Sequence, residues 1–168
     1  MTDRGPRVNG DQSILNVSGA SPDWRACALA NFPLAPFELD GEVFASVEGF
    51  LQGIKFPPGH PSRDAAFRSY AHAAKTLGAA AERHSVWWRG EVIPYGSPAH
   101  HALLARGIRA KFHCNRGLQL ALAATAGMRL IHDVGPESPT TSLPAVVFCR
   151  ILTALRDELL ASGAIAAP

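Results

Sequence analysis

The chain has 168 residues, of which 47% are hydrophobic and 18% charged, and its formal net charge is +2. This composition fits one folded domain and excludes a disordered chain, and no apolar run reaches the roughly 20 residues that a membrane helix needs. The first residues contain no apolar segment of the kind found in secretory signals. The three cysteines, Cys27, Cys114 and Cys149, lie far apart, which favours a reduced cytoplasmic setting and argues against structural zinc.

Residues 1–20 are rich in Gly, Asp, Asn and Ser, with one short β-like piece, SILNV. They are typical of a flexible N-terminal segment or a loosely attached strand. We expect residues 21–162 to form the domain and residues 163–168 to form a C-terminal tail.

The stretch FELDGEVF, residues 37–44, predicts a β-hairpin, because Asp40-Gly41 is favoured in a two-residue type I′ turn. Ser46 then stands where a helix N-cap is expected. One buried stripe at helical spacing follows, made of Val47, Phe50, Leu51 and Ile54. Pro57-Pro58-Gly59 ends this helix.

The rest of the chain is predicted to be mainly helical with a few short strands, an α-rich α+β fold. A second helix is expected from Ser62 or Arg63 to Leu77, with Gly78 as its C-terminal signal. Residues 86–98 are expected to form a loop or short strand, and 132–144 a loop. Further helices are expected from Pro98 or Ala99 to Phe112, from Arg116 to Ala126, and from Ala145 to Ser162.

Residues 92–132 contain no Asp or Glu but several cationic side chains, namely Arg106, Arg109, Lys111, Arg116 and Arg129. A segment of one charge sign can create a local positive field that suits phosphate groups. The alternative is a solvated face whose charge is balanced by acidic neighbours in space.

Glu48, Gln52 and Lys55 fall on one strip of the helix after the hairpin, beside its apolar stripe. A carboxylate next to an apolar wall can activate water or stabilise developing positive charge, although polar residues in this position are usually solvated. The adjacent Trp87 and Trp88 point opposite ways in an extended segment, so one can stack on a flat base while the other fills the core. Packing of both in the core is the more frequent outcome.

Several segments, in order, resemble the NADAR or YbiA-like family. They are LANFPLAPFELDGEVFASVEGFLQGIKF, AAKTLG, LLARGIRAKFHCNRGLQLALAATAG and FCRILTALRDEL, which together cover about residues 28–160. The resemblance implies a compact helical domain and hydrolysis of ribosyl N-glycosidic bonds. It makes Glu48 the essential glutamate and assigns substrate binding to Asn31, Phe32, Gln52, Lys55, Lys75, Lys111 and Asn115, with Trp87 or Trp88 as the family's tryptophan.

The C-terminal part departs from the family's pattern. The stretch HDVGPESPTTSLPAVVFCRIL has no Trp-Gly pair, and Val146 and Cys149 stand where Asn and Gly are expected. Asp133 or Glu137 is expected to replace the missing acidic residue as the second catalytic carboxylate. We therefore expect the part of the site that selects the substrate to differ from that of other family members.

The resemblance implies a hydrolase for an ADP-ribosylated base or a related NAD-derived substrate, with nucleic acid as a possible carrier of the modification. One alternative is an N-glycosidase for a phosphorylated ribosylamino-pyrimidine intermediate of riboflavin synthesis. The other is a non-catalytic module that senses ADP-ribose or related nucleotides. No metal, cofactor or membrane is expected in any of these activities.

Overall fold

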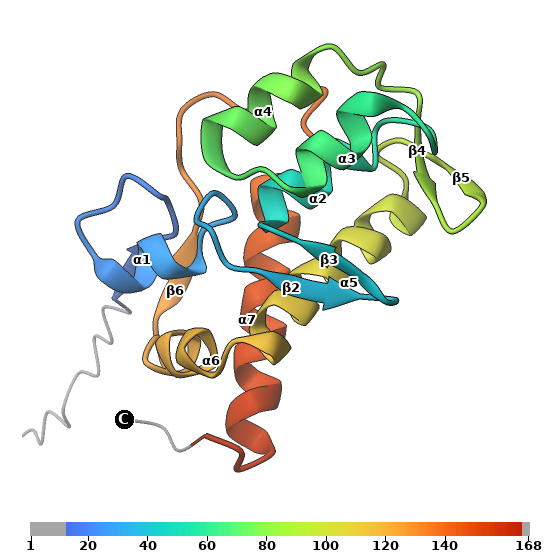
Figure 1. Ribbon diagram of the computed structural model, residues 1–168. Helices are drawn as coiled ribbons and strands as arrows, with labels where there is room; N and C mark the ends of the chain where they lie inside the picture. The colour runs from blue at the N-terminus through green and yellow to red at the C-terminus, as the bar shows by residue number, and fades with distance from the viewer. Residues whose placement is uncertain (1–12, 166–168) are drawn as a thin grey trace, which may run out of the picture.

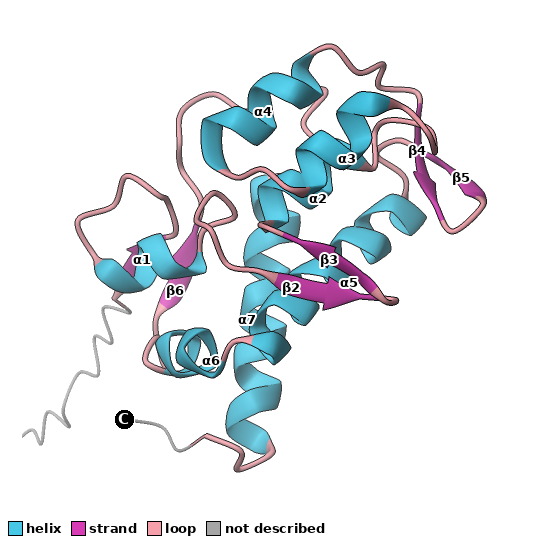
Figure 2. Cartoon of the chain, in the orientation of Figure 1, coloured by secondary structure: helices cyan, strands magenta, loops and turns pink. Residues whose placement is uncertain are grey.

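Helices are the main secondary structure of the computed structural model, which describes residues 13–165 (Figure 1). The helices are α1 (Trp24–Leu29), α2 (Val47–Gly53), α3 (Pro61–Phe67), α4 (Ala71–Ala79), α5 (Pro98–Cys114), α6 (Arg116–Ala123) and α7 (Ala145–Ala161). The strands are β1 (Ile14–Asn16), β2 (Phe37–Leu39), β3 (Glu42–Phe44), β4 (Ser85–Trp88), β5 (Glu91–Pro94) and β6 (Arg129–Ile131). They form three separate two-stranded pairs (Figure 2). The predicted helical fold with few short strands is confirmed.

The long helices α5 and α7 cross behind the β2–β3 hairpin, and the hydrophobic core lies where these elements meet (Figure 1). Helix α5 contacts α2, α6 and α7 as well as β2. The largest apolar side chains that are fully buried include Phe44, Phe50, Phe112 and Phe148. Among residues 13–165, none of the helices has the combination of length and hydrophobicity that a membrane-spanning segment needs.

The predicted hairpin and the helix that follows it are confirmed. Strand β2 pairs antiparallel with β3, and the turn residues Asp40 and Gly41 have φ of 53° and 80°, as a type I′ turn requires. The Ser46 hydroxyl oxygen accepts a hydrogen bond from the Gly49 N–H at 2.9 Å and so caps α2. The hairpin turn and the Ser46 cap, both formed by neighbouring residues, therefore fix where α2 begins.

The single helix predicted from Ser62 or Arg63 to Leu77 is wrong, because the chain breaks it into α3 and α4. In a continuous helix the Ala71 N–H would bond to the Phe67 carbonyl. Instead, Ala71 N–H donates to the Phe32 carbonyl at 3.0 Å, and the Phe67 carbonyl accepts from Ala45 N–H at 2.8 Å. Ala71 has a φ of 50°. Hydrogen bonds to residues distant in sequence thus replace the bonds that a continuous helix would form. Gly78, predicted to follow the helix, lies inside α4.

Part of the segment predicted to be flexible belongs to the folded domain. Strand β1 pairs in parallel with β6, and Leu15 and Val17 are buried in the core. Residues 1–12 of the predicted flexible segment and residues 166–168 of the predicted tail lie outside the described residues. The β1–β6 pair joins segments more than a hundred residues apart, so local patterns could not predict it.

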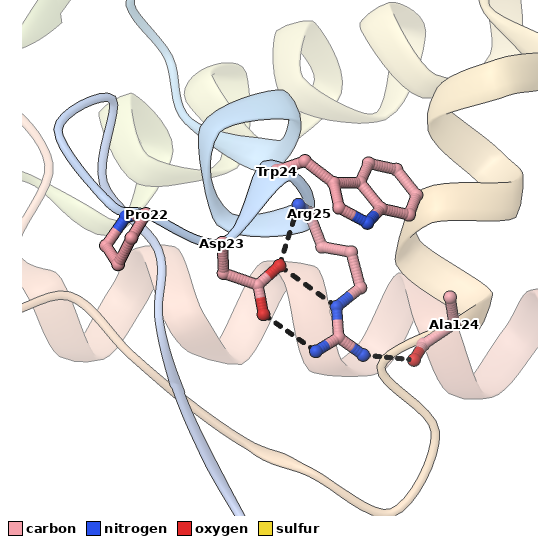
Figure 3. A pocket seen from close by; sticks show the side chains of 5 residues that line it. All are labelled: Pro22, Asp23, Trp24, Arg25 and Ala124. Carbon is pink, nitrogen blue, oxygen red and sulfur yellow. Dashed lines mark hydrogen bonds and ion pairs between the residues drawn. The ribbon is translucent and has the colours of Figure 1, made fainter.

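A hydrogen bond from Arg25 links α1 to α6 beside a depression on the surface (Figure 3). Asp23 caps α1 by accepting from the Arg25 N–H at 2.9 Å, and its carboxylate also pairs with the Arg25 guanidinium at 2.7 Å. The same guanidinium donates to the Ala124 carbonyl at the end of α6 at 3.1 Å. This arrangement holds the helix that leads directly into Asn31 and Phe32.

Candidate active site between α2, α4 and the loop 132–144

A cavity of about 1220 Å³ lies among the first turns of α2 and α4, the Asn31–Phe32 segment and the loop 132–144. That loop runs beside α4 between β6 and α7 (Figure 1). The cavity brings together Asn31, Phe32, Glu48, Gln52, Lys55 and Lys75, which the resemblance assigns to the site. It also exposes Tyr70, His72, Arg83 and Tyr95, which the sequence did not single out. None of these follows a periodic pattern that would have marked it.

Glu48 opens into this cavity from the first turn of α2, with only 7% of its surface exposed. The Gln52 side-chain amide donates to Glu48 Oε1 at 2.8 Å, and Lys55 Nζ donates to Gln52 Oε1 at 2.6 Å. The backbone N–H of Glu48 donates to the Asn31 carbonyl at 3.0 Å. Gln52 therefore orients the carboxylate and links it to the ammonium group.

The local electrostatics adjust the proton affinities of both charged groups. Burial raises the pKa of Glu48, while the hydrogen bond from Gln52 and the charges of Lys55, Lys75 and His72 oppose this rise. Burial lowers the pKa of Lys55 to about 8; Arg83 and Lys75 reinforce this shift and Glu48 opposes it. A carboxyl group with raised proton affinity beside an open cavity is suited to proton transfer.

The backbone of α4 leaves room for Gln52 at one position. A Cβ atom on Gly78 would lie 1.7 Å from Gln52 Oε1. The glycine predicted as a helix stop therefore has a different role, because it lets α4 approach the side chain that orients Glu48.

The Asn31–Phe32 segment forms the cavity wall next to Glu48. The Asn31 Oδ1 atom is buried and has no hydrogen-bond partner among residues 13–165. A ligand hydroxyl can satisfy such an acceptor. The Phe32 ring meets the His72 ring edge-on at 5.3 Å and lies 5.8 Å from Lys75 Nζ. This wall offers both a polar group and an aromatic surface.

Lys111 and Asn115, which the resemblance assigns to substrate binding, do not line the cavity. Lys111 Nζ donates to the carbonyls of Ala30 at 2.7 Å and Ala28 at 3.2 Å. Burial lowers the pKa of this ammonium group to about 7. Asn115 Nδ2 donates to the carbonyls of Lys111 and Pro36. Both side chains thus hold the backbone on either side of Asn31 and Phe32.

Neither tryptophan lines the cavity either, so the expected stacking of Trp87 or Trp88 on a base has no support from their positions. Trp88 is 4% exposed, packs against the Phe50 ring at 5.5 Å and donates from Nε1 to Asp40 Oδ2 at 3.0 Å. Trp87 is anchored through its backbone N–H to the Ile54 carbonyl at 2.8 Å. The aromatic side chains at the cavity are instead Phe32, Tyr70 and Tyr95.

The basic segment 92–132 does not supply the arginine or lysine side chains of this cavity. Arg106 pairs with Asp40, Arg109 pairs with Glu158, and Lys111 lies in the interior. For Arg106 and Arg109 this agrees with the alternative in which acidic neighbours balance the segment. The cations at the cavity are Lys55, Lys75 and Arg83, and from the segment's basic residues only His132 joins them.

Asp133 and Glu137 both line the cavity, but other parts of the chain use their polar groups. Asn16 forms two hydrogen bonds with the backbone of Asp133, at 2.8 and 2.9 Å, and an Asp133 carboxylate oxygen accepts from Gly135 N–H. Glu137 Oε2 accepts from Ala145 N–H at 2.6 Å, at the first residue of α7. Glu137 therefore acts as a helix cap. No group of three or more potential metal ligands occurs within residues 13–165.

The chain resembles known proteins over most of its length. Its fold is similar to that of the Escherichia coli protein YbiA solved by NMR, with a TM-score of 0.64 and 18% identity over 92% of this chain and 89% of that chain. It is 33% identical over 148 residues to an uncharacterized 17.1 kDa protein of Enterobacteria phage T4 from the Gp30-rIII intergenic region, covering 81% of this chain and 93% of that protein.

The predicted resemblance to the YbiA-like proteins is thus confirmed. The pattern of the family described as Bacteriophage protein GP30.3 matches residues 23–157. Because this match spans most of the chain, the protein belongs to the Bacteriophage protein GP30.3 family.

Proposed function

We propose that the protein hydrolyses the N-glycosidic bond of a ribosyl compound, with an ADP-ribosylated base as the preferred substrate. The observation that carries the proposal is Glu48, a buried carboxylate that opens into a large cavity and is oriented by Gln52. The proposal also rests on the family resemblance of the Glu48 motif.

A carboxylate near the sugar assists the breaking of this bond. When the C1′–N bond breaks, its electron pair leaves with the base and positive charge develops at C1′. An ionised Glu48 stabilises that charge and accepts a proton from the water that attacks C1′. The hydrogen bond from Gln52 holds the carboxylate in one orientation, so little reorganisation is needed during the reaction.

The remaining cavity groups fit the parts of such a substrate. Lys75 and Arg83 supply positive charge for a phosphate or diphosphate. Phe32 and Tyr70 present aromatic surface for a base. The unpaired Asn31 Oδ1 suits a ribose hydroxyl. The cavity volume of about 1220 Å³ leaves room for a dinucleotide-sized ligand.

The test is release of the base from an ADP-ribosylated oligonucleotide and, in parallel, from the phosphorylated ribosylamino-pyrimidine of riboflavin synthesis. We expect release from the first substrate. Release only from the second would assign the protein to the metabolite. Binding of ADP-ribose without release from either substrate would favour a sensing module and refute the hydrolase.

Glu48→Gln tests the assigned residue. We expect turnover to fall by about 10³-fold, as when a group that stabilises transition-state charge is removed, while ADP-ribose binding measured by calorimetry is retained. The matched control is Glu38→Gln, because Glu38 is an exposed carboxylate on β2 outside the cavity. Full activity of Glu48→Gln would remove Glu48 from the reaction.

A further inference from the structure

The proposed reaction needs a proton for the departing base as well as a carboxylate for the sugar. A nitrogen base leaves readily only when the electron pair it takes from the C1′–N bond is protonated. Asp133 and Glu137 were expected to supply this acid, but Gly135 N–H occupies a carboxylate oxygen of Asp133 and Ala145 N–H occupies one of Glu137. Since each of these carboxylates already accepts a backbone N–H, a cavity side chain without such a bond is the better candidate for the donor.

Two histidines line the cavity, and they differ in what their rings contact. His132 Nδ1 is 2.6 Å from the Val17 carbonyl oxygen, and its ring packs edge-on against Phe148 at 5.3 Å. Among residues 13–165, the imidazole nitrogens of His72 form no hydrogen bond, and the ring contacts Phe32. His132 is thus held at one ring nitrogen, whereas both ring nitrogens of His72 are available to a ligand.

The backbone fixes where His72 stands. The preceding residue, Ala71, has a φ of 50° and donates its N–H to the Phe32 carbonyl at 3.0 Å. The neighbouring Asn31 carbonyl accepts from the Glu48 N–H at 3.0 Å. The Asn31–Phe32 segment is therefore bonded to the start of α2 on one side and to the start of α4 on the other. This ties His72 and Glu48 to adjacent parts of one wall.

Both side chains line the same cavity. The His72 ring lies across the Phe32 ring at 5.3 Å with an interplanar angle of 81°. The other charged groups that face this space are Lys55 after α2, Lys75 on α4, Arg83, and Asp133 and Glu137 on the loop.

We infer that His72 donates the proton that the base takes up as its bond to the sugar breaks. This inference rests on the proposed hydrolase function. In the step, the C1′–N electron pair moves to the base nitrogen, which takes a proton from the His72 imidazolium. Water adds to C1′ and gives a proton to Glu48. The products are the free base and the sugar with a hydroxyl group at C1′, and exchange with solvent returns the proton from Glu48 to His72.

The experiment compares wild type and His72→Gln on two forms of the substrate that wild type cleaves in the assay above. One form carries its own base, and the other carries the same base fluorinated on the ring, which makes the departing nitrogen less basic. We expect His72→Gln to lose about 10²-fold in rate on the unmodified base, as for loss of a general acid, and clearly less on the fluorinated one. Adding imidazole to His72→Ala should restore part of the rate.

The matched control is His113→Gln, since His113 is an exposed histidine on α5 outside the cavity, and we expect it to cleave both forms at the wild-type rate. Equal losses on the two forms, or a loss below threefold, would overturn the inference while leaving the hydrolase intact. Absence of base release by wild type from every substrate would instead refute the proposed function.

Discussion

The two walls of the cavity are built in opposite ways. All seven residues of α2 are buried, including Glu48 and Gln52. Across the cavity, residues 133–140 are exposed, and a few hydrogen bonds from Asn16, Tyr95 and Arg83 attach this loop to the domain. A reacting group needs a rigid frame, while a wall that selects ligands tolerates change in sequence and conformation. In the proposed reaction, the carboxylate therefore belongs to the rigid α2, His72 stands beside it on α4, and the loop is the wall suited to ligand selection.

The rigidity of α2 comes from close backbone approaches. A Cβ atom on Gly49 would lie 2.4 Å from the Ala66 carbonyl oxygen, and one on Gly53 would lie 2.3 Å from the Phe67 ring. A Cβ on Gly107 of α5 would lie 2.5 Å from the Phe50 ring. Glycines therefore let α3 and α5 pack directly against the helix that carries Glu48.

The largest effect is expected where this packing is broken. Gly49→Ala places its Cβ against two backbone oxygens, at 2.4 Å from Ala66 and 2.5 Å from Ser69, and backbone cannot give way as a flexible side chain can. We expect the free energy of unfolding to fall by about 3 kcal/mol, which corresponds to roughly 6–12 °C in melting temperature for a chain of this size. Thermal unfolding measures this change.

Gly117→Ala is the matched control for that substitution. Gly117 lies in α6, and a Cβ there would meet nothing within 4 Å. Because alanine favours the helix, the variant should gain up to about 1 kcal/mol. Equal destabilisation of both variants would contradict the view that α2 is packed more closely than α6 at these positions.

The second prediction concerns Lys111, which supports the Asn31–Phe32 wall from the interior. Its pKa of about 7 in the folded protein lies below the ordinary lysine value of about 10.4. Between these pH values the unfolded chain binds more protons, so the protein becomes more stable as pH rises from 7 towards 10. Below pH 7 the cost of burying the charge is present in full.

Lys111→Met should remove the contribution of Lys111 to this pH dependence. The gain in stability between pH 7 and 9 should then be smaller by up to about 2 kcal/mol. Denaturant unfolding at both pH values measures it. Part of the dependence should persist in the variant, because Lys55 has a lowered pKa of about 8 and acts in the same direction. If the unfolding free energy of the variant changed with pH as much as that of wild type, Lys111 would not have the lowered pKa that burial gives it.

The third prediction concerns Tyr95, whose substitution should weaken the attachment of the loop 132–144 and leave α2 unchanged. The Tyr95 hydroxyl lies 2.8 Å from both the Thr140 carbonyl oxygen and Ser142 Oγ. Tyr95→Phe removes these bonds at a cost of about 1 kcal/mol, so amides in residues 138–142 should exchange about fivefold faster. We expect KM to rise and kcat to stay within about twofold, since only substrate contacts change. A fall in kcat at constant KM would place chemistry on the loop.

The smallest effect is expected for Glu137→Gln. If this side chain mainly caps α7 through Ala145 N–H, turnover should change by less than about threefold, in contrast to the loss of 10² or more expected for a proton donor. The melting temperature should fall slightly, because a carboxylate near a helix N-terminus is stabilising. A large loss of turnover would restore Glu137 as the second catalytic carboxylate, and Asp133→Asn is the parallel test for the other candidate.

Local patterns in the sequence were sufficient for the hairpin and the start of α2. Asp40-Gly41 specifies the turn, and Ser46 caps the helix with its own side chain. The break between α3 and α4 could not be predicted, because the groups that interrupt the helix are Ala45 and Phe32, far away in sequence. The prediction that residues 92–132 supply the cations of the site was also wrong. The order of charges along the chain does not show which acidic groups fold against a basic segment.

The sequence by itself therefore determined the element that carries Glu48, its cap and the family to which its motif belongs. Only the tertiary structure decided which neighbours that carboxylate has. Lys111 and Trp88 face the interior, whereas His72, Tyr70 and Arg83 reach the cavity. The physical reason is range: turns and caps depend on bonds within a few residues, but burial and the grouping of charges depend on packing between segments that only the complete fold brings together.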